Sequence, residues 1–371
     1  MGPKVETIAV LAPALFPTFS NNFCSLAMRI YFLLILLSLC TTSNRAQSQR
    51  LSPTLVIHGG AGAMSRTAMS REAEAAYRAG LERALRAGYS VLDSGGSALD
   101  AVTIAVTMLE DDSLFNAGRG AVLTRAGTFE LDAAIMDGRS QAAGSVAGIK
   151  TVKNPVLAAR AVMEKSPHVM LAGPGADSFA KDIGLVTVPH AYFFTQKSFQ
   201  SLEHYRRDEA ERRRKADSAK GSGALPPLNP DQKWGTVGAV ALDRAGHLAA
   251  ATSTGGMTGK RLGRIGDAPV IGAGTYANDA TCAISCTGWG EYFIRLSMAK
   301  SVSDRMELAG QPLQAAGDTM IYKRLPQLGG DGGLIAVDKA GNITMPFNTA
   351  GMFRGWMRKG ESPQVRIWKD E

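Results

Sequence analysis

The chain has 371 residues, of which 45% are hydrophobic and 20% are charged. This ordinary globular composition excludes an intrinsically disordered chain and leaves ample material for a core. The net charge of +8 would suit a nucleic-acid or membrane partner. However, the arginine-rich run 206–215 contains interspersed acidic residues and no aromatic residue. A solvated helix or linker is therefore predicted there, with no nucleic-acid partner.

Residues 1–50 have the pattern of a leader. The apolar run 30–39 follows Arg29 and precedes a polar segment, as in a secretory signal. The run is short for a membrane span, although a retained anchor stays open as an alternative. We therefore predict a signal peptide within residues 1–50 and an exported protein, either periplasmic or secreted.

The first part of the folded chain alternates helices and strands. The predicted elements are a strand over 54–57, a glycine turn over 58–63, helices that start after Ser70 and Ser97, strands over 131–136 and 145–150, and a helix that starts at Pro155. From residue 201 to 231, charged and small residues give way to glycines and prolines. This composition predicts a mobile linker that leads to Gly235.

After the linker the pattern is rich in strands. The predicted elements are a hairpin of 236–243 and 248–254, a second strand pair of 270–276 and 281–287, a helix over 291–306, and strands over 333–337 and 342–346. Helices and strands occur on both sides of the linker. We therefore predict one layered α+β domain that includes both sides.

The segment Gly235–Thr236 has the residue types that a self-cleaving threonine hydrolase needs. A cut between the two residues would give Thr236 a free α-amine beside its hydroxyl. One residue would then supply both the nucleophile and its base, and no distant histidine is required. The alternative is that Gly-Thr-Val simply begins a strand.

Small polar residues gather at turns after Thr236. Arg264 and Asp267 flank Gly266 and could bind the carboxylate and the ammonium group of an amino acid. The turn Thr287–Gly288 could stabilise an oxyanion with a hydroxyl and backbone amides. A surface Arg-Asp ion pair and ordinary hairpin turns remain the alternatives.

Taken together, these motifs resemble the plant-type asparaginases and isoaspartyl peptidases of the N-terminal nucleophile hydrolases. The matching segments are His58–Gly62, Leu114–Gly118, Leu131–Ala133, Asn154–Pro155, Gly235–Val240, Ser253–Gly256, Gly263–Asp267, Thr287–Gly288, Gly329–Gly333 and Phe347–Thr349. The sequence departs from the family pattern at Ala268, where serine is usual, and at the bulky Trp289.

The resemblance implies a four-layer αββα sandwich that is cleaved into two subunits from one precursor. The first subunit would end at Gly235, after a linker over 201–235, and the second would comprise residues 236–371. The resemblance also implies a homodimer of cleaved protomers and no organic cofactor. It further implies a structural sodium ion held by the backbone carbonyls of Leu109, Glu110, Phe115, Ala117 and Arg119.

The resemblance also assigns roles within the site. Thr236 would be the nucleophile at the cleavage site after Gly235. The implied catalytic set is Thr236, Thr254, Thr287, Gly288 and Asn116. The implied substrate-binding set is Arg264, Asp267, Thr287, Gly288 and Gly290.

The implied activity is hydrolysis of isoaspartyl dipeptides and L-asparagine through a β-aspartyl ester on Thr236. Two alternatives stay open. One is a glycosylasparaginase, which has the same chemistry with a sugar on the leaving group. The other is an exported binding protein of the same fold that catalyses nothing.

Overall fold

The computed structural model describes residues 52–62, 64–218 and 235–371. The predicted leader and residues 219–234 of the predicted linker lie outside these described residues. By its own contacts, the chain from Leu51 to Glu371 is one compact unit. Within the described part, no helix is both long enough and apolar enough to cross a membrane.

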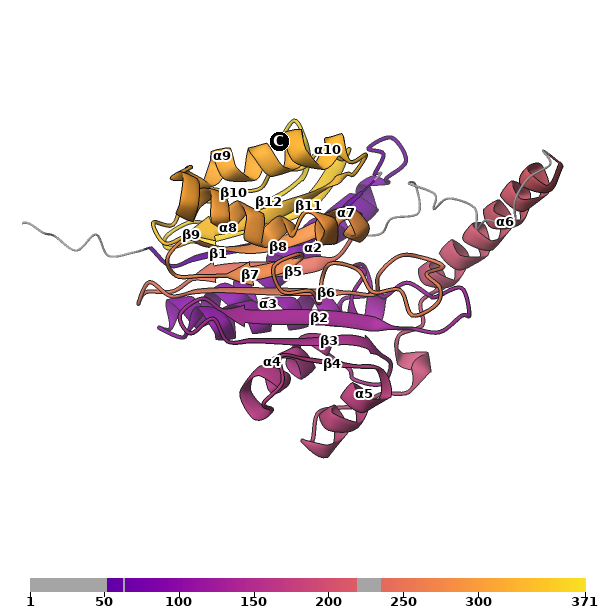
Figure 1. The fold of residues 1–371 in the computed structure, drawn as a ribbon, viewed down its shortest axis with the longest axis horizontal. Helices are drawn as coiled ribbons and strands as arrows, with labels where there is room; N and C mark the ends of the chain where they lie inside the picture. The colour runs from indigo at the N-terminus through magenta and orange to yellow at the C-terminus, as the bar shows by residue number, and fades with distance from the viewer. Residues whose placement is uncertain (1–51, 63, 219–234) are drawn as a thin grey trace, which may run out of the picture. The chain divides into compact units, whose positions relative to one another are not determined.

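The larger of two sheets has eight strands in the order β12-β11-β1-β5-β6-β2-β3-β4 (Figure 1). Its strands are β1 (Thr54–Gly62), β2 (Leu131–Asp137), β3 (Ala143–Ile149), β4 (Met170–Ala172), β5 (Val237–Leu242), β6 (Leu248–Thr254), β11 (Gly351–Arg358) and β12 (Gln364–Trp368). All of its strand pairs are antiparallel except β3 with β4. Strand β5 is buried along its whole length and lies between β1 and β6.

The smaller sheet has four strands in the order β10-β9-β8-β7. They are β7 (Thr275–Ala277), β8 (Cys282–Gly288), β9 (Gly332–Asp338) and β10 (Ile343–Thr344). Strands β8 and β9 pack against β5 of the larger sheet, so the two sheets face each other. Apolar residues from both sheets, such as Val240 and Ile284, share one core.

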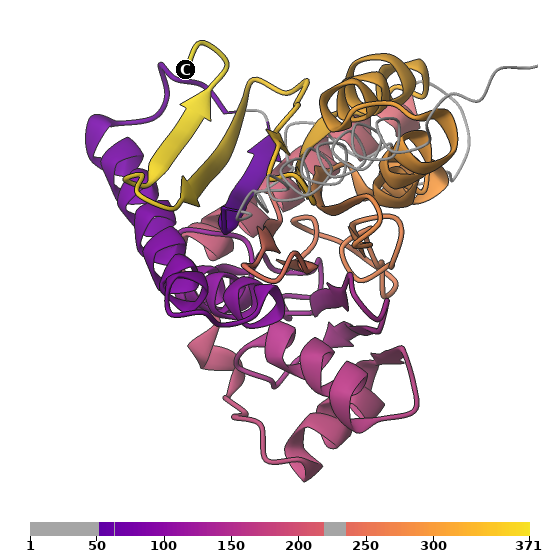
Figure 2. The same ribbon diagram turned by 90° about the vertical axis from the view of Figure 1, so that its left-hand side faces the viewer.

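Helices cover the outer face of each sheet. Those packed on the larger sheet include α2 (Arg71–Asp93), α3 (Ala98–Asp111), α4 (Pro155–Lys165) and α5 (Gly173–Asp182). Those associated with the smaller sheet are α7 (Gly290–Arg295), α8 (Met298–Ala309) and α9 (Leu313–Asp318), followed by a π-helical segment over 319–324 and α10 (Leu325–Gln327). Figure 2 shows the indigo helices α2 and α3 on one side of the strands and the orange helices on the other. This arrangement is consistent with the fold that the resemblance implies.

Several predicted elements are confirmed with small shifts in their ends. Ser70 and Ser97 cap α2 and α3, where their hydroxyls accept hydrogen bonds from Ala73 N and Asp100 N. Strands β5 and β6 form the predicted hairpin.

The glycine turn predicted over 58–63 is wrong. Strand β1 continues from His58 to Gly62, with an irregularity in its pairing to β11 between His58 and Gly60. The second predicted strand pair is also shorter than expected, because β7 begins only at Thr275.

Two predicted segments have a different helical structure. The single helix predicted over 291–306 is two helices, because Ser297 takes a left-handed conformation with φ of 44° between α7 and α8. The linker predicted from residue 201 is wrong over 201–218, which belong to helix α6 (Gln196–Ser218). Leu202 and Tyr205 anchor α6 in the core.

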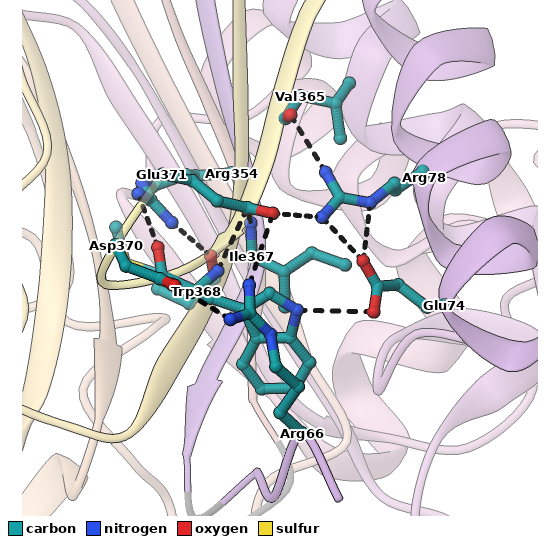
Figure 3. Close-up of polar contacts among 10 residues, drawn as sticks. Arg66, Glu74, Arg78, Arg354, Val365, Ile367, Trp368, Asp370 and Glu371 are labelled. Atoms are coloured by element: carbon teal, nitrogen blue, oxygen red, sulfur yellow. Dashed lines mark hydrogen bonds and ion pairs between the residues drawn. The ribbon is translucent and has the colours of Figure 1, made fainter. Parts of the chain in front are cut away.

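A polar cluster joins the start of α2 to strands β11 and β12 (Figure 3). Arg78 forms ion pairs with Glu74 and Glu371, and Glu371 also accepts hydrogen bonds from the backbone of Ile367 and Trp368. Arg354 is 5% exposed and donates to the carbonyls of Met352 and Trp368, each at 3.1 Å. Burial lowers the pKa of Arg354 to about 10.

We expect Arg354→Met to destabilise the fold by about 2–4 kcal/mol, because two backbone carbonyls lose their buried donor. Arg66→Met is the matched control. Arg66 belongs to the same cluster but is half exposed, so its loss should change the free energy of unfolding much less. Urea unfolding followed by circular dichroism measures both. Equal midpoints for the two variants would contradict the role given to Arg354.

Candidate active site

Thr236 lies one residue before β5, in the middle of the larger sheet. It is 7% exposed. The register of β5 with β6 pairs Val237 with Ser253, which places Thr236 opposite Thr254 at the end of β6. Thr236 Oγ1 donates to Thr254 Oγ1 at 3.2 Å, and Thr254 Oγ1 also accepts from Gly256 N at 2.9 Å. The Thr236 hydroxyl is therefore held by a side chain that is itself fixed by a turn.

The backbone nitrogen of Thr236 is held from the other sheet. Thr287, near the end of β8, accepts a hydrogen bond from Thr236 N at 3.2 Å and one from Ala61 N at 3.2 Å. The next residue, Gly288, has φ of 146°, and a Cβ there would lie 2.5 Å from the Asp331 carbonyl oxygen. This position therefore requires glycine. The Thr287 hydroxyl, which the sequence predicts at an oxyanion site, thus contacts the backbone nitrogen of Thr236 in this structure.

Gly235 packs directly on the backbone of β1. A Cβ on Gly235 would lie 2.1 Å from Gly60 Cα, and a Cβ on Gly60 would lie 2.4 Å from Gly235 Cα. Gly60 has φ of 111° and lies where the pairing of β1 with β11 is irregular. The glycines of β1 therefore make room for the bond between Gly235 and Thr236.

His58 is a buried site residue that the sequence analysis did not assign. Its Nε2 lies 2.9 Å from Ser285 Oγ, which lies 2.7 Å from Thr252 Oγ1. Thr275 Oγ1 donates to Thr252 Oγ1 at 2.6 Å. Burial lowers the pKa of His58 to about 3, although a hydrogen bond with the Thr236 backbone acts in the opposite direction. His58 is therefore neutral near pH 7 and is a poor general base.

Arg264 forms a two-pronged ion pair with Glu291, from Nε at 3.0 Å and Nη2 at 2.9 Å. No role for Glu291 follows from the sequence. Asp267 is 4% exposed, which excludes an exposed Arg-Asp pair, and its Oδ2 has no hydrogen-bond partner among the described residues. Burial raises the pKa of Asp267 to about 7, although the nearby Arg264 charge opposes the shift.

Gly290 links these groups to Thr287. A Cβ on Gly290 would lie 2.9 Å from Arg264 Nη2, from Asp267 N and from Asp267 Oδ1. Gly290 is only three residues after Thr287, which contacts Thr236. The structure therefore brings the candidate nucleophile and the candidate anchoring pair to one end of β8.

Asn116 connects the loop after α3 to the turn after β6. Its Nδ2 donates to the Gly256 carbonyl at 2.8 Å, and its Oδ1 accepts from Val122 N at 3.0 Å. Its own carbonyl accepts from Gly255 N at 3.1 Å. Asn116 therefore stabilises the turn that fixes Thr254.

The segment 109–120 includes the backbone carbonyls that the family resemblance implies as sodium ligands, and it folds back tightly on itself. A Cβ on Gly118 would lie 2.5 Å from the Glu110 carbonyl oxygen, and one on Gly120 would lie 2.0 Å from that of Phe115. The Glu110 carbonyl is also in the last turn of α3, where helix carbonyls lack intrahelical donors. Neutral carbonyl oxygens are ligands that hard cations take, but those of Phe115 and Ala117 also accept hydrogen bonds from Ala117 N and Gly120 N, each at 3.0 Å. No group of three or more His, Cys, Asp or Glu side chains in the described part of the chain could hold a metal.

Comparison with known proteins identifies the family. A sequence profile described as asparaginase matches residues 51–367. The chain is 50% identical over 317 residues to the isoaspartyl peptidase of Escherichia coli (strain K12), which covers 85% of this chain and 96% of the relative. It is 42% identical over 333 residues to the probable isoaspartyl peptidase/L-asparaginase 2 of Arabidopsis thaliana, covering 85% and 98%.

The similarity extends to animals. The chain is 42% identical over 302 residues to the isoaspartyl peptidase/L-asparaginase of Mus musculus, covering 81% of this chain and 87% of the relative. None of these three relatives is named a glycosylasparaginase, so they do not favour that alternative. Because the family profile and these relatives match most of its length, this chain belongs to the asparaginase family.

Proposed function

We propose that this protein is a self-cleaving amidohydrolase that hydrolyses isoaspartyl dipeptides and L-asparagine. The observation that carries the proposal is the arrangement around Thr236. Its hydroxyl contacts Thr254, its nitrogen contacts Thr287, and the carbonyl to be attacked belongs to Gly235, which packs on Gly60. The names of the relatives support the substrate class.

Self-cleavage would start with attack of the Thr236 hydroxyl on the Gly235 carbonyl. The C–N bond breaks, the acyl group moves to oxygen as an ester, and the nitrogen takes a proton to become the free α-amine. Water then opens the ester. This releases a chain ending at Gly235 and a chain beginning at Thr236. The neutral His58 is not needed as a base in this sequence of steps.

Substrate hydrolysis would reuse the same hydroxyl. An α-amine has an ordinary pKa of about 8, so a useful fraction is neutral near pH 7 and can accept the hydroxyl proton. Thr236 attacks the side-chain carbonyl of the substrate, and the amine or ammonia leaves with a proton. The resulting β-aspartyl ester is opened by water. Arg264 would bind the substrate α-carboxylate, and Asp267 the α-ammonium.

The remaining family features are also proposals. The carbonyls of the loop after α3 would hold a sodium ion, which would fix the loop that carries Asn116 without taking part in bond making. The cleaved protomers would pair as a homodimer. The leader would direct export, and the mature protein would begin after residue 40 and before Pro53.

The first test concerns Thr236. We expect Thr236→Ala to stay one chain and to be inactive, because both reactions use the lost hydroxyl. Thr236→Ser keeps a hydroxyl but loses the methyl group that restricts its rotamer, so it should cleave slowly and retain weak activity. Intact-mass measurement over time follows cleavage, and an isoaspartyl dipeptide assay follows activity. Two chains from the alanine variant would refute the proposal.

The second test concerns Arg264. We expect Arg264→Ala to lose about 2–5 kcal/mol of apparent substrate binding and to cleave itself normally. The precursor offers no free α-carboxylate at the scissile bond, so cleavage does not need this side chain. Arg295→Ala, at an exposed position of α7, is the control and should keep its catalytic efficiency. Unchanged efficiency in Arg264→Ala would show that the arginine is structural.

The third test uses pH. Asp267 must be ionised to bind an ammonium group, and its pKa in the free enzyme is raised to about 7. We therefore expect kcat/KM to fall as the pH is lowered through 7. At saturating substrate, kcat should not show this fall at low pH, because the bound ammonium group keeps the Asp267 carboxylate ionised. The α-amine affects both profiles, so their difference isolates Asp267. Identical profiles would contradict the assignment.

A further inference from the structure

Glu209 is a buried carboxylate that the proposed reaction does not use. It lies on α6 and is 3% exposed. Three arginines from three segments surround it. Arg125 Nε lies 2.7 Å from Oε2, and Arg261 Nη1 and Arg213 Nη2 lie 3.2 Å and 3.8 Å from Oε1. Because a buried charge is costly without partners, the site depends on these arginines.

Arg261 begins the turn that ends at Arg264. The Arg261 carbonyl accepts a hydrogen bond from Arg264 N at 3.0 Å. Between them, Leu262 and Gly263 have φ of 58° and 69°. Leu262 adopts a conformation that residues other than glycine rarely take, and it is 94% exposed, so its own packing does not hold it there. The turn must be held by its neighbours.

Helix α6 holds the same loop by packing. A Cβ on Gly259 would lie 2.5 Å from the ring of Tyr205, which is 4% exposed. On its other side, the loop bonds to the segment before β2, through Gly259 N to the Leu123 carbonyl at 2.9 Å and through Arg125 N to the Lys260 carbonyl at 3.0 Å. The loop is therefore fixed up to Arg261, where Glu209 supplies the last contact before the strained turn.

We propose that Glu209 is a positioning residue for substrate binding. It fixes Arg261, the Arg261 carbonyl fixes the backbone of Arg264, and Arg264 presents its guanidinium to the substrate carboxylate. The inference rests on the proposed function. In the cleaved enzyme, Glu209 would belong to the chain that ends at Gly235 and Arg261 to the chain that begins at Thr236. The ion pair would thus make binding by the second chain depend on a helix of the first.

The test is the KM of Glu209→Gln for an isoaspartyl dipeptide. We expect KM to rise on the order of tenfold, as for other residues that act through a chain of contacts. Both kcat and the rate of self-cleavage should stay near wild-type values, because Thr236 and its contacts are untouched. Glu211→Gln is the matched control: Glu211 lies on the same helix and pairs with Lys215 at the surface, and its KM should not change.

Two further measurements separate positioning from a general loss of stability. Arg261→Met should raise KM like Glu209→Gln, and the double variant should be no worse than either single variant, because both remove one interaction. Limited trypsin digestion should cut after Arg264 faster in Glu209→Gln than in wild type at equal thermal stability. If Glu209→Gln does not fold, Arg261→Met and its digestion still decide the question.

The outcomes also separate the two proposals. A wild-type protein without isoaspartyl hydrolysis would overturn the proposed function. If the wild type is active, an unchanged KM in Glu209→Gln or in Arg261→Met would overturn the positioning role alone. The same holds if the rise in KM of the double variant equals the product of the rises in the two single variants.

Discussion

The contact between the backbones of Gly60 and Gly235 is the constraint on which the site depends. A Cβ on either residue would overlap the Cα of the other, so neither position can have a side chain. At Gly60 the pairing of β1 with β11 is irregular, whereas the pairing of β1 with β5 is regular from Thr54 to His58. It fixes the peptide before Thr236 against a strand, while threonines from β6 and β8 hold the two ends of the Thr236 residue. The sheet thus sets the position of the Gly235 carbonyl, which the proposed self-cleavage would attack.

The sequence predicted the parts of the site that follow from local pattern. Thr236, Thr254 and Thr287 lie at the ends of strands that alternation and turn residues reveal, and the caps at Ser70 and Ser97 follow from short-range spacing. The residues around Thr236 and Thr287 suggest a nucleophile and an oxyanion site but leave ordinary strands and turns open as alternatives. The role of Thr254 follows only from the family resemblance.

The parts that sequence could not predict depend on partners far apart in the chain. His58 bonds to Ser285, which is 227 residues later, and Glu209 pairs with one arginine before Thr236 in the chain and one after it. No local period encodes such pairs. Strands β11 and β12 were also missed. Their basic and aromatic residues do not alternate simply. The charge of Arg354 is accommodated in the interior by hydrogen bonds to the Met352 and Trp368 carbonyls, which lie in the same two strands.

If the proposed cleavage occurs, the strand order of the larger sheet has a consequence for the life of the protein afterwards. Starting from the edge strand β12, the second chain would supply β12 and β11, and the first chain would supply β1. The second chain would then supply β5 and β6, and the first chain β2, β3 and β4. Neither chain could form this sheet by itself, because β1 would have both of its neighbours from the other chain. The precursor folds as one molecule, whereas two separated chains would have to find each other first. Cleavage would therefore be irreversible for folding, because two separated chains could no longer refold as one molecule. The lifetime of the cleaved enzyme would then be set by its rate of unfolding.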